Sequence, residues 1–232
     1  MPRARSQQYD DRQTAAADHD AGGCLSFYAL PPLAVILIAC LLAALASRIP
    51  IQTPASPIVQ PVSTTSSGLS HIFTREIQFW GNDILRWANA SFLDPNLVAT
   101  VMQIESCGDP RALSRSGAMG LFQVMPFHFR LGENGFDIET NALRGLEYLS
   151  NSLQTANGNP RLALAGYNGG IGVIGIGEWA WHAETQRYVR YGEPIYNDAQ
   201  SGLSSSVSLD EWYQSYGEGL CRQASQRLGL DN

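Results

Sequence analysis

The sequence predicts a mainly α-helical domain preceded by one N-terminal transmembrane helix. Near the N-terminus, 23 consecutive residues carry no charge, and a Pro- and Ser-rich stretch follows them. Beyond that stretch, apolar residues recur at three- and four-residue steps, which is typical of amphipathic helices. The same region has no long alternation of apolar and polar residues of the kind that predicts strands.

Charge composition limits the classes of partner. The 232 residues carry 15 Lys+Arg against 21 Asp+Glu, a formal net charge of −6, and all 15 basic residues are Arg. Proteins that bind nucleic acid usually present a basic face, so we expect no nucleic-acid partner. A chain of this length holds one domain of ordinary size with an appendage.

The 23 residues from Cys24 to Ala46 carry no charge. A helix needs about 20 apolar residues to cross the hydrocarbon core of a bilayer, so this stretch is long enough. Pro31 and Pro32 are compatible with the first turn of such a helix. We therefore expect residues 24–49 to form a transmembrane signal anchor.

Arginine positions predict the orientation of this anchor. Arg3, Arg5 and Arg12 precede the segment, and only Arg48 follows it closely. By the positive-inside rule, residues 1–23 form a cytoplasmic tail. The chain is then a single-pass protein of the cell membrane with its main domain on the extracytoplasmic side.

Two other interpretations of the segment stay open. Ala44-Leu45-Ala46 resembles the cleavage site of a removed signal peptide. Leu37-Ile38-Ala39-Cys40 resembles a lipobox, in which the Cys would be acylated. All three interpretations place the rest of the chain outside the cytoplasm.

Residues 50–70 are rich in Pro, Ser and Thr and show no helical period. Such a stretch cannot bury enough apolar surface to fold alone, so we expect a semi-extended linker. The folded domain should then span residues 71–232.

Helical periodicity and capping residues predict the elements of this domain. Asp94 and Pro95 supply an N-cap and an N1 proline for a second helix, which Gly108 and Pro110 end. The expected helices are Phe73–Ala90; Pro95 to Glu105 or Ser106; Asn141–Ala156, with Leu143, Leu146, Leu149 and Leu153 on one face; Arg161–Tyr167; and one or two helices from a Ser208/Glu211 capping box to Leu228.

The second helix places a carboxylate where an apolar residue is expected. Val98, Val101 and Met102 mark its apolar face, and the next position of that stripe is Glu105. Burial disfavours the charged form, so such a Glu holds its proton toward neutral pH, as a general acid requires. The alternative is a helix-end Glu that faces solvent or pairs with Arg.

Four segments follow in order from the end of this helix: Glu105-Ser106 with Pro110, Ala112 and Ser114; Gly117 to Pro126 (GAMGLFQVMP); Ala163 to Gly170 (ALAGYNGG); and Glu184-Thr185 with Tyr188-Val189. Together they resemble the soluble lytic transglycosylase (SLT) family, which is lysozyme-like and cleaves peptidoglycan glycan strands. Gly166 departs from the family pattern, which usually has Ala before the Tyr.

The resemblance implies a lysozyme-like (SLT or goose-type lysozyme-like) domain with a single catalytic carboxylate. Glu105 would protonate the bond between N-acetylmuramic acid and N-acetylglucosamine, and the muramic acid 6-hydroxyl would close a 1,6-anhydro ring. We expect peptidoglycan strands as the partner, a monomer, and no cofactor or metal. The expected substrate-binding residues are Ser106, Gln123, Met125, Tyr167, Asn168, Glu184 and Tyr188.

Two alternative functions remain. A lysozyme-type muramidase would use water, with Asp109 or Glu184 as a second carboxylate. A noncatalytic glycan-binding module would not need the acid. Trp179 and Trp181 are candidate platforms for sugar stacking, or core aromatics.

Other motifs predict little. Gly170 to Gly175 matches GxGxxG but follows a helical pattern, so a dinucleotide site is not expected. His71, His128 and His182 lack the spacing of zinc ligands. Cys107 and Cys221 are the two cysteines outside the membrane segment, and an oxidising compartment favours a disulfide between them. Two buried free thiols are the alternative.

Overall fold

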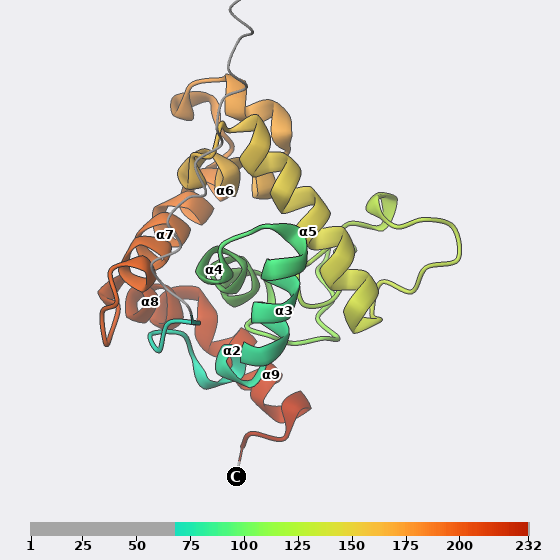
Figure 1. The fold of residues 1–232 in the computed structure, drawn as a ribbon, viewed down its shortest axis with the longest axis vertical. Coiled ribbons are helices and arrows are strands. Elements are labelled where there is room, and N and C mark those ends of the chain that lie inside the picture. Colours follow the sequence, from blue (N-terminus) through green and yellow to red (C-terminus); the bar gives the residue numbers. More distant parts are fainter. Residues whose placement is uncertain (1–67, 232) are drawn as a thin grey trace, which may run out of the picture. The chain divides into compact units, whose positions relative to one another are not determined.

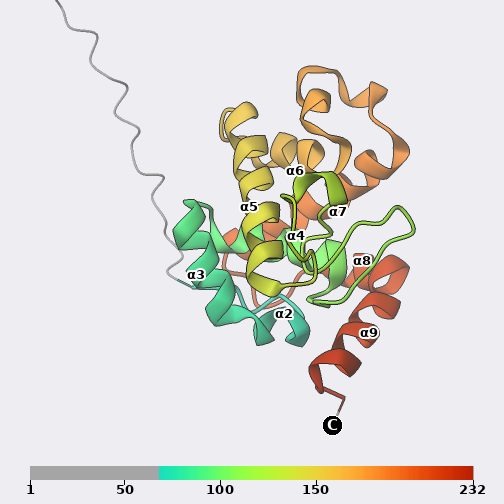
Figure 2. The same cartoon turned by 90° about the vertical axis from the view of Figure 1, so that its right-hand side faces the viewer.

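The computed structural model describes residues 68–231, which form a mainly α-helical domain (Figures 1 and 2). Short 3-10 turns η1 (Pro126–His128), η2 (Ile171–Gly175) and η3 (Glu178–Ala180) and a π-helical segment η4 (Tyr213–Gly217) interrupt the helices. The α-helices are α2 (Arg75–Phe79), α3 (Gly81–Ser91), α4 (Pro95–Ser106), α5 (Ile138–Thr155), α6 (Pro160–Gly169), α7 (Ala183–Gln200), α8 (Val207–Trp212) and α9 (Glu218–Leu228).

The predicted tail (1–23), signal anchor (24–49) and most of the linker (50–70) lie outside the described residues. Within residues 68–231, none of the helices has the length and apolarity needed to span a bilayer. The mainly α prediction for the domain is confirmed by the helices above.

Helix α4 is the centre of the domain. It packs against α2, α3, α7 and α9, and Figure 1 views it end-on with other helices around it. The Asp94 side chain accepts hydrogen bonds from the first turn, as predicted, and Pro95 occupies N1. Val98, Val101 and Met102 are completely buried, so the predicted apolar face is confirmed.

The helix expected over Phe73–Ala90 is wrong in one respect, because the structure divides it at Trp80. The Trp80 backbone leaves the helical region and its N–H bonds the Ile77 carbonyl, which closes α2. Its indole nitrogen donates to the Gly108 carbonyl at 2.9 Å. The bend still leaves Ile77, Trp80 and Ile84 in the core.

Helices α5 and α6 follow the prediction closely. Helix α5 ends at Thr155, where Asn157 and Gly158 turn into the left-handed region. Leu146 and Leu149 are buried, but Leu143 is 51% exposed, so its predicted place on the buried face is wrong. The face of α5 that packs in the core is therefore narrower than the leucine spacing suggested.

The C-terminal helices reach Leu228 as predicted, but their start is different. Ser206, two residues before the predicted cap Ser208, accepts a hydrogen bond from the Leu209 N–H and begins α8. The π-helical segment η4 separates α8 from α9, and a side chain at Gly217 would collide with the Trp212 ring. Glycine there lets the π turn pack on this tryptophan.

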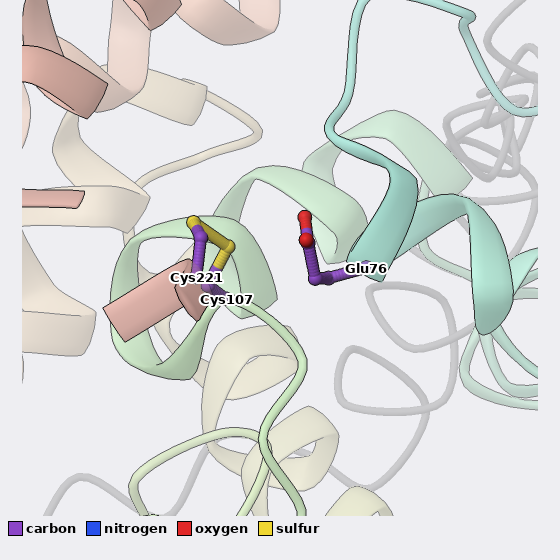
Figure 3. A group of neighbouring side chains, drawn as sticks. All are labelled: Glu76, Cys107 and Cys221. Atoms are coloured by element: carbon purple, nitrogen blue, oxygen red, sulfur yellow. A yellow bond between two sulfur atoms is a disulfide. The ribbon is translucent and has the colours of Figure 1, made fainter. Parts of the chain in front are cut away.

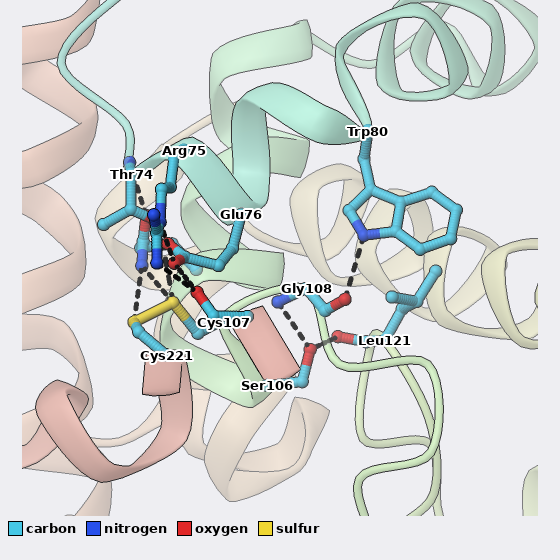
Figure 4. The surroundings of a disulfide bond; sticks show 11 residues. Thr74, Arg75, Glu76, Trp80, Ser106, Cys107, Gly108, Leu121 and Cys221 are labelled. Carbon is cyan, nitrogen blue, oxygen red and sulfur yellow. Dashed lines mark hydrogen bonds and ion pairs between the residues drawn. A yellow bond between two sulfur atoms is a disulfide. The ribbon is translucent and has the colours of Figure 1, made fainter. Parts of the chain in front are cut away.

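A disulfide joins Cys107 to Cys221 across 114 residues, as predicted (Figure 4). Cys107 is the left-handed C-cap of α4, and Cys221 lies in α9. Both cysteines are buried, so the bond fixes the end of the central helix to the C-terminal helix inside the core.

The Glu76 carboxyl lies beside this disulfide (Figure 3). The three side chains do not form a metal site, because both sulfurs belong to the disulfide. Burial alone would raise the pKa of Glu76, but hydrogen bonds from Ser225 and Arg75 outweigh it and hold the pKa below its ordinary value. The Glu76 carboxylate thus links α2 to α9 beside the disulfide.

We expect the oxidised protein to be more stable than the Cys107→Ser/Cys221→Ser variant by about 2–5 kcal/mol, because the closed loop is long. Urea denaturation followed by circular dichroism measures the difference. Dithiothreitol should lower the midpoint of the natural protein and leave that of the variant unchanged. Equal midpoints for the two oxidised proteins would contradict this expectation.

Candidate active site

A cavity of about 410 Å³ opens beside the C-terminal end of α4. Its walls come from α4, the loop before η1, α6, α7 and the C-terminal α8–α9 region. The lining residues are Ile104, Glu105, Ala112, Leu113, Ser114, Gln123, Asn168, Glu184, Arg187, Tyr188, Tyr191, Trp212, Tyr216, Leu220 and Gln223.

Glu105 occupies the last turn of α4 and points its carboxyl into this cavity. The pKa of Glu105 is raised to about 8, chiefly because burial disfavours the charged form; the hydroxyl of Tyr188 opposes this rise, and the negative charge of Glu184 adds to it. The carboxyl therefore holds its proton at neutral pH. This is the protonation state that the sequence predicted for a general acid.

Tyr188 brings a phenol to the same point from α7. Its ring is buried, and its hydroxyl makes no hydrogen bond of normal length and angle within the described residues. Burial and the neighbouring Glu105 raise the pKa of Tyr188 well above its ordinary value, so the phenol keeps its proton. A buried donor without a full partner is costly, and a substrate oxygen in the cavity would supply that partner.

Glu184 lies one turn before Tyr188, in the first turn of α7, and is exposed on the cavity wall. The cavity therefore contains two carboxyl groups of different character, one desolvated and one exposed to water.

Gln123 reaches the cavity from a compact loop. Two antiparallel bridges, Leu113 with Met119 and Met119 with Val124, fold residues 112–124 back on themselves. Gln123 adopts a left-handed conformation with φ 46°, and its amide nitrogen donates to the carbonyls of Gly120 and Ala112. These bonds fix the side chain with its amide at the cavity wall.

Asn141 of α5 binds the loop that carries Gln123 through three side-chain hydrogen bonds. Its side chain accepts from the Phe122 N–H at 2.9 Å and donates to the carbonyls of Met119 and Gly135 at 2.7 and 2.9 Å. Gly120 has φ 72°, and a Cβ there would lie 2.5 Å from the Asn141 amide nitrogen. Glycine is therefore required for the loop to pack against α5.

Tyr167 and Asn168 lie in the last turns of α6, before the Gly-rich turn, as predicted. The Tyr167 hydroxyl donates to the Phe122 carbonyl at 2.7 Å, which commits it to the loop that carries Gln123. Asn168 lines the cavity, and its carbonyl oxygen accepts from Thr185 of α7 at 2.9 Å. Tyr167 supports the loop, while Asn168 faces the cavity.

Ser106 does not contact the cavity, contrary to the prediction. It is completely buried, and its hydroxyl donates to the Leu121 carbonyl at 2.7 Å while accepting from the Gly108 N–H (Figure 4). The serine fixes the end of α4 to the loop that carries Gln123. Ser106 is thus a positioning residue.

Met125 also lies outside the main cavity. It lines a smaller hollow of about 50 Å³ together with Tyr148 and Tyr167, and Gln123 contributes to both. The two hollows therefore meet at Gln123. Met125 does not line the cavity that contains Glu105, and its expected contact with the substrate stays a prediction.

Asp109 is excluded as a second carboxylate at this cavity. Its carboxylate is buried, pairs with Arg227 at 2.7 Å and accepts from Gln223 at 2.6 Å. Of the two tryptophan candidates, Trp181 is a core residue whose indole donates to the Val173 carbonyl, and Trp179 is 87% exposed in a separate hollow.

Gly166, the one departure from the family pattern, is explained by packing. A Cβ at this position would collide with the Ser152 hydroxyl and lie 2.7 Å from Ile174. The Ser152 hydroxyl donates to the Ala163 carbonyl at 2.8 Å, which joins α5 to α6. The glycine therefore tightens this wall rather than loosening it.

The sequence did not predict the wall of the cavity that comes from the C-terminal α8–α9 region. Trp212, Tyr216, Leu220 and Gln223 come from the C-terminal helices, more than 100 residues after Glu105, and belong to no recognised motif. Arg187 carried a weak signal, because it lies between Glu184 and Tyr188 of the fourth matching segment.

Residues 83–184 match the Transglycosylase SLT domain family. The transglycosylase of Enterobacteria phage PRD1 is 38% identical over 115 residues, or 48% of this chain and 40% of the phage protein. The membrane-bound lytic murein transglycosylase C of Photorhabdus laumondii is 31% identical over 148 residues, or 50% of this chain and 42% of that protein. The chain thus spans about two fifths of the length of these relatives.

Among solved structures, the inactive mutant of lytic transglycosylase Slt from Pseudomonas aeruginosa is similar at 24% identity and a TM-score of 0.42. The similarity covers 54% of this chain and 24% of that one. The sequence comparisons confirm the resemblance to the SLT family for the central part of the domain. The matched range contains Glu105, Gln123, Tyr167 and Asn168, and it ends at Glu184.

We expect Glu105→Gln to stabilise the protein at neutral pH. The pKa of Glu105 rises from 4.5 to about 8 on folding, so the native state binds the proton more tightly. Stability is then lost as pH rises from about 4.5 through 8, at up to about 1.4 kcal/mol per unit.

Urea denaturation at pH 4.5 and pH 7.5 tests this expectation. At pH 4.5 the variant should unfold at the same urea concentration as the natural protein. At pH 7.5 its free energy of unfolding should be higher by at least about 1 kcal/mol. Exposed Glu211→Gln serves as the control, with no gain at either pH. Identical pH dependence for all three proteins would show that Glu105 is not desolvated.

Gly120→Ala should destabilise the domain by about 2–4 kcal/mol, because left-handed strain adds to a collision with Asn141. Gly132→Ala is the matched control, since Gly132 has φ 87° with no atom within 4 Å of its Cβ position. It should cost about 1 kcal/mol from strain alone. Thermal unfolding measures both, and equal losses would argue against the packing role of Gly120.

Proposed function

We propose that this SLT-domain protein is a membrane-tethered peptidoglycan lytic transglycosylase. Residues 71–232 form the catalytic domain, and the substrate is the β-1,4 bond between N-acetylmuramic acid and N-acetylglucosamine. The product carries a 1,6-anhydro ring on the muramic acid. The observation that supports this proposal best is the desolvated carboxyl of Glu105, whose pKa is raised to about 8, in an open cavity.

Glu105 acts first as an acid and then as a base. Its proton passes to the glycosidic oxygen as the bond to C1 breaks and positive charge develops on the sugar ring. The resulting carboxylate then accepts the proton of the muramic acid 6-hydroxyl, whose oxygen attacks C1 and closes the ring. The carboxyl is restored with its proton, and water is not consumed.

Neighbouring residues bind the sugar during these steps. The amide of Gln123 and the side chain of Asn168 face the cavity and offer polar contacts to hydroxyl and acetamido groups. The Tyr188 hydroxyl, which lacks a partner of normal geometry in the described part of the chain, can donate to an oxygen near C1. No step needs a metal or a cofactor.

The membrane tether rests on the uncharged segment from Cys24 to Ala46. The name of one relative, membrane-bound lytic murein transglycosylase C, supports membrane association for this chain as well. Residues 50–70 would hold the catalytic domain a short distance from the bilayer, where peptidoglycan is within reach.

Hydrolysis is the second candidate, because Glu184 lines the same cavity as Glu105. Its charge raises the pKa of Glu105, which places the two carboxyl groups within electrostatic reach of each other. A general base at this position would activate water and give a reducing end instead of an anhydro ring.

Mass spectrometry of muropeptides released from purified peptidoglycan tests the function. The natural protein should release products lighter by one water than reducing muropeptides, and Glu105→Gln should release at least about 100-fold less, because general acid catalysis is lost. Glu211→Gln, on the exposed face of α8, should behave as the natural protein does.

Reducing products that disappear with Glu184→Gln would instead establish hydrolysis with two carboxylates. Binding of peptidoglycan without any release would move the assignment to a noncatalytic glycan-binding module.

A further inference from the structure

The wall of the cavity that lies beyond the family match contains a cation. Arg187, on α7, is exposed and lines the cavity together with Tyr216 of η4. Its guanidinium carbon lies 5.2 Å from the centre of the Tyr216 ring. Among the described residues, Arg187 makes no ion pair, although Glu184 is three positions away on the same helix.

The aromatic contact holds the Arg187 side chain over the cavity without using its donors. An arginine that stacks on a ring keeps the N–H groups at the edge of its plane available. Tyr216 is itself held by Tyr191 of α7, whose ring centre is 5.6 Å away. The positive charge is therefore positioned in advance, and its hydrogen-bonding edge is open.

The charges that line the cavity indicate which substrate group Arg187 can bind. The charged or titratable acids that line it are Glu105, which holds its proton at neutral pH, and Glu184. Among the residues that line the cavity, Arg187 supplies the positive charge that can attract a substrate carboxylate. The guanidinium matches a carboxylate in a two-bond geometry that neutral sugar hydroxyls do not need.

We propose that Arg187, held by Tyr216, binds a carboxylate of the substrate and so selects muramic-acid-containing strands over neutral N-acetylglucosamine polymers. The inference rests on the proposed function, because it assigns the substrate class to the same cavity. The carboxylate belongs either to the stem peptide or to the lactyl group of a strand without peptides. Arg187 is a substrate-binding residue in this scheme, and it does not contact the bond that breaks.

Arg190 provides a matched control on the same helix. It is exposed, its guanidinium carbon lies 5.7 Å from the centre of the Tyr191 ring, and it does not line the cavity. Substitution of either arginine removes one positive charge and one cation–π contact from the same pair of tyrosines. Only Arg187 should affect the recognition of a carboxylate.

Calorimetric binding in the full-length Glu105→Gln protein tests the proposal with three ligands. These are glycan tetrasaccharides with stem peptides, the same tetrasaccharides after amidase has removed the peptides, and neutral chitotetraose. Arg187→Gln should weaken binding of the carboxylate-containing ligands by roughly 10- to 100-fold and leave chitotetraose unchanged, whereas Arg190→Gln should change none.

The two tetrasaccharides identify the carboxylate. A loss confined to the peptide-bearing ligand assigns the stem peptide, a loss confined to the peptide-free ligand assigns the lactyl carboxylate, and a loss with both shows that Arg187 binds either carboxylate. Equal losses for all three ligands, or none, would overturn the proposal, because the first indicates a structural role and the second no role.

Activity separates this inference from the proposed function. With the natural Glu105 present, Arg187→Gln should raise KM for peptidoglycan with little change in kcat, and Arg187→Lys should restore part of the loss. A natural protein that binds carboxylate ligands through Arg187 but releases no product would disprove the transglycosylase and retain the binding site.

Discussion

The site depends on how the C-terminal end of α4 is held. Glu105 is in the last turn of this helix, where an α-helix ordinarily frays. Three consecutive residues prevent this: Ser106 bonds the loop that carries Gln123, Cys107 is bonded to α9, and the carbonyl of Gly108 accepts from Trp80. Two of these contacts fix Glu105 relative to walls of the cavity, namely the loop that carries Gln123 and α9, and the third fixes the end of α4 to Trp80.

Glu105 holds its proton, whereas the two other acids near the end of α4 are bound by side chains outside the cavity. Asp109 pairs with Arg227, and Glu76 receives hydrogen bonds from Ser225 and Arg75. Asp109 therefore joins the residues after α4 to α9, and Glu76 joins α2 to α9. Asp109 and Glu76 thus stabilise the structure, and Glu105 holds its proton in the cavity. All three acids lie close to the Cys107–Cys221 disulfide in space or in sequence.

Local signals explain what could be predicted from the sequence. The Asp94-Pro95 cap, the stripe that ends in Glu105 and the segment carrying Gln123 are read from neighbouring residues, and the structure bears out their positions. The break at Trp80, the burial of Ser106 and the C-terminal wall could not be predicted, because each depends on a partner far along the chain. Spacing shows which residues share a face, but not which face meets another helix.

The covalent link between Cys107 and Cys221 also sets an order of assembly. Cys107, two residues after the acid, is synthesised 114 residues before its partner Cys221, and the aromatic wall of α8 and η4 is made only shortly before Cys221. A nascent chain that has emerged only as far as α7 carries Glu105, Gln123 and Asn168 but cannot enclose a sugar between them. Synthesis itself therefore delays the appearance of a complete cleft until nearly the whole domain is available to fold.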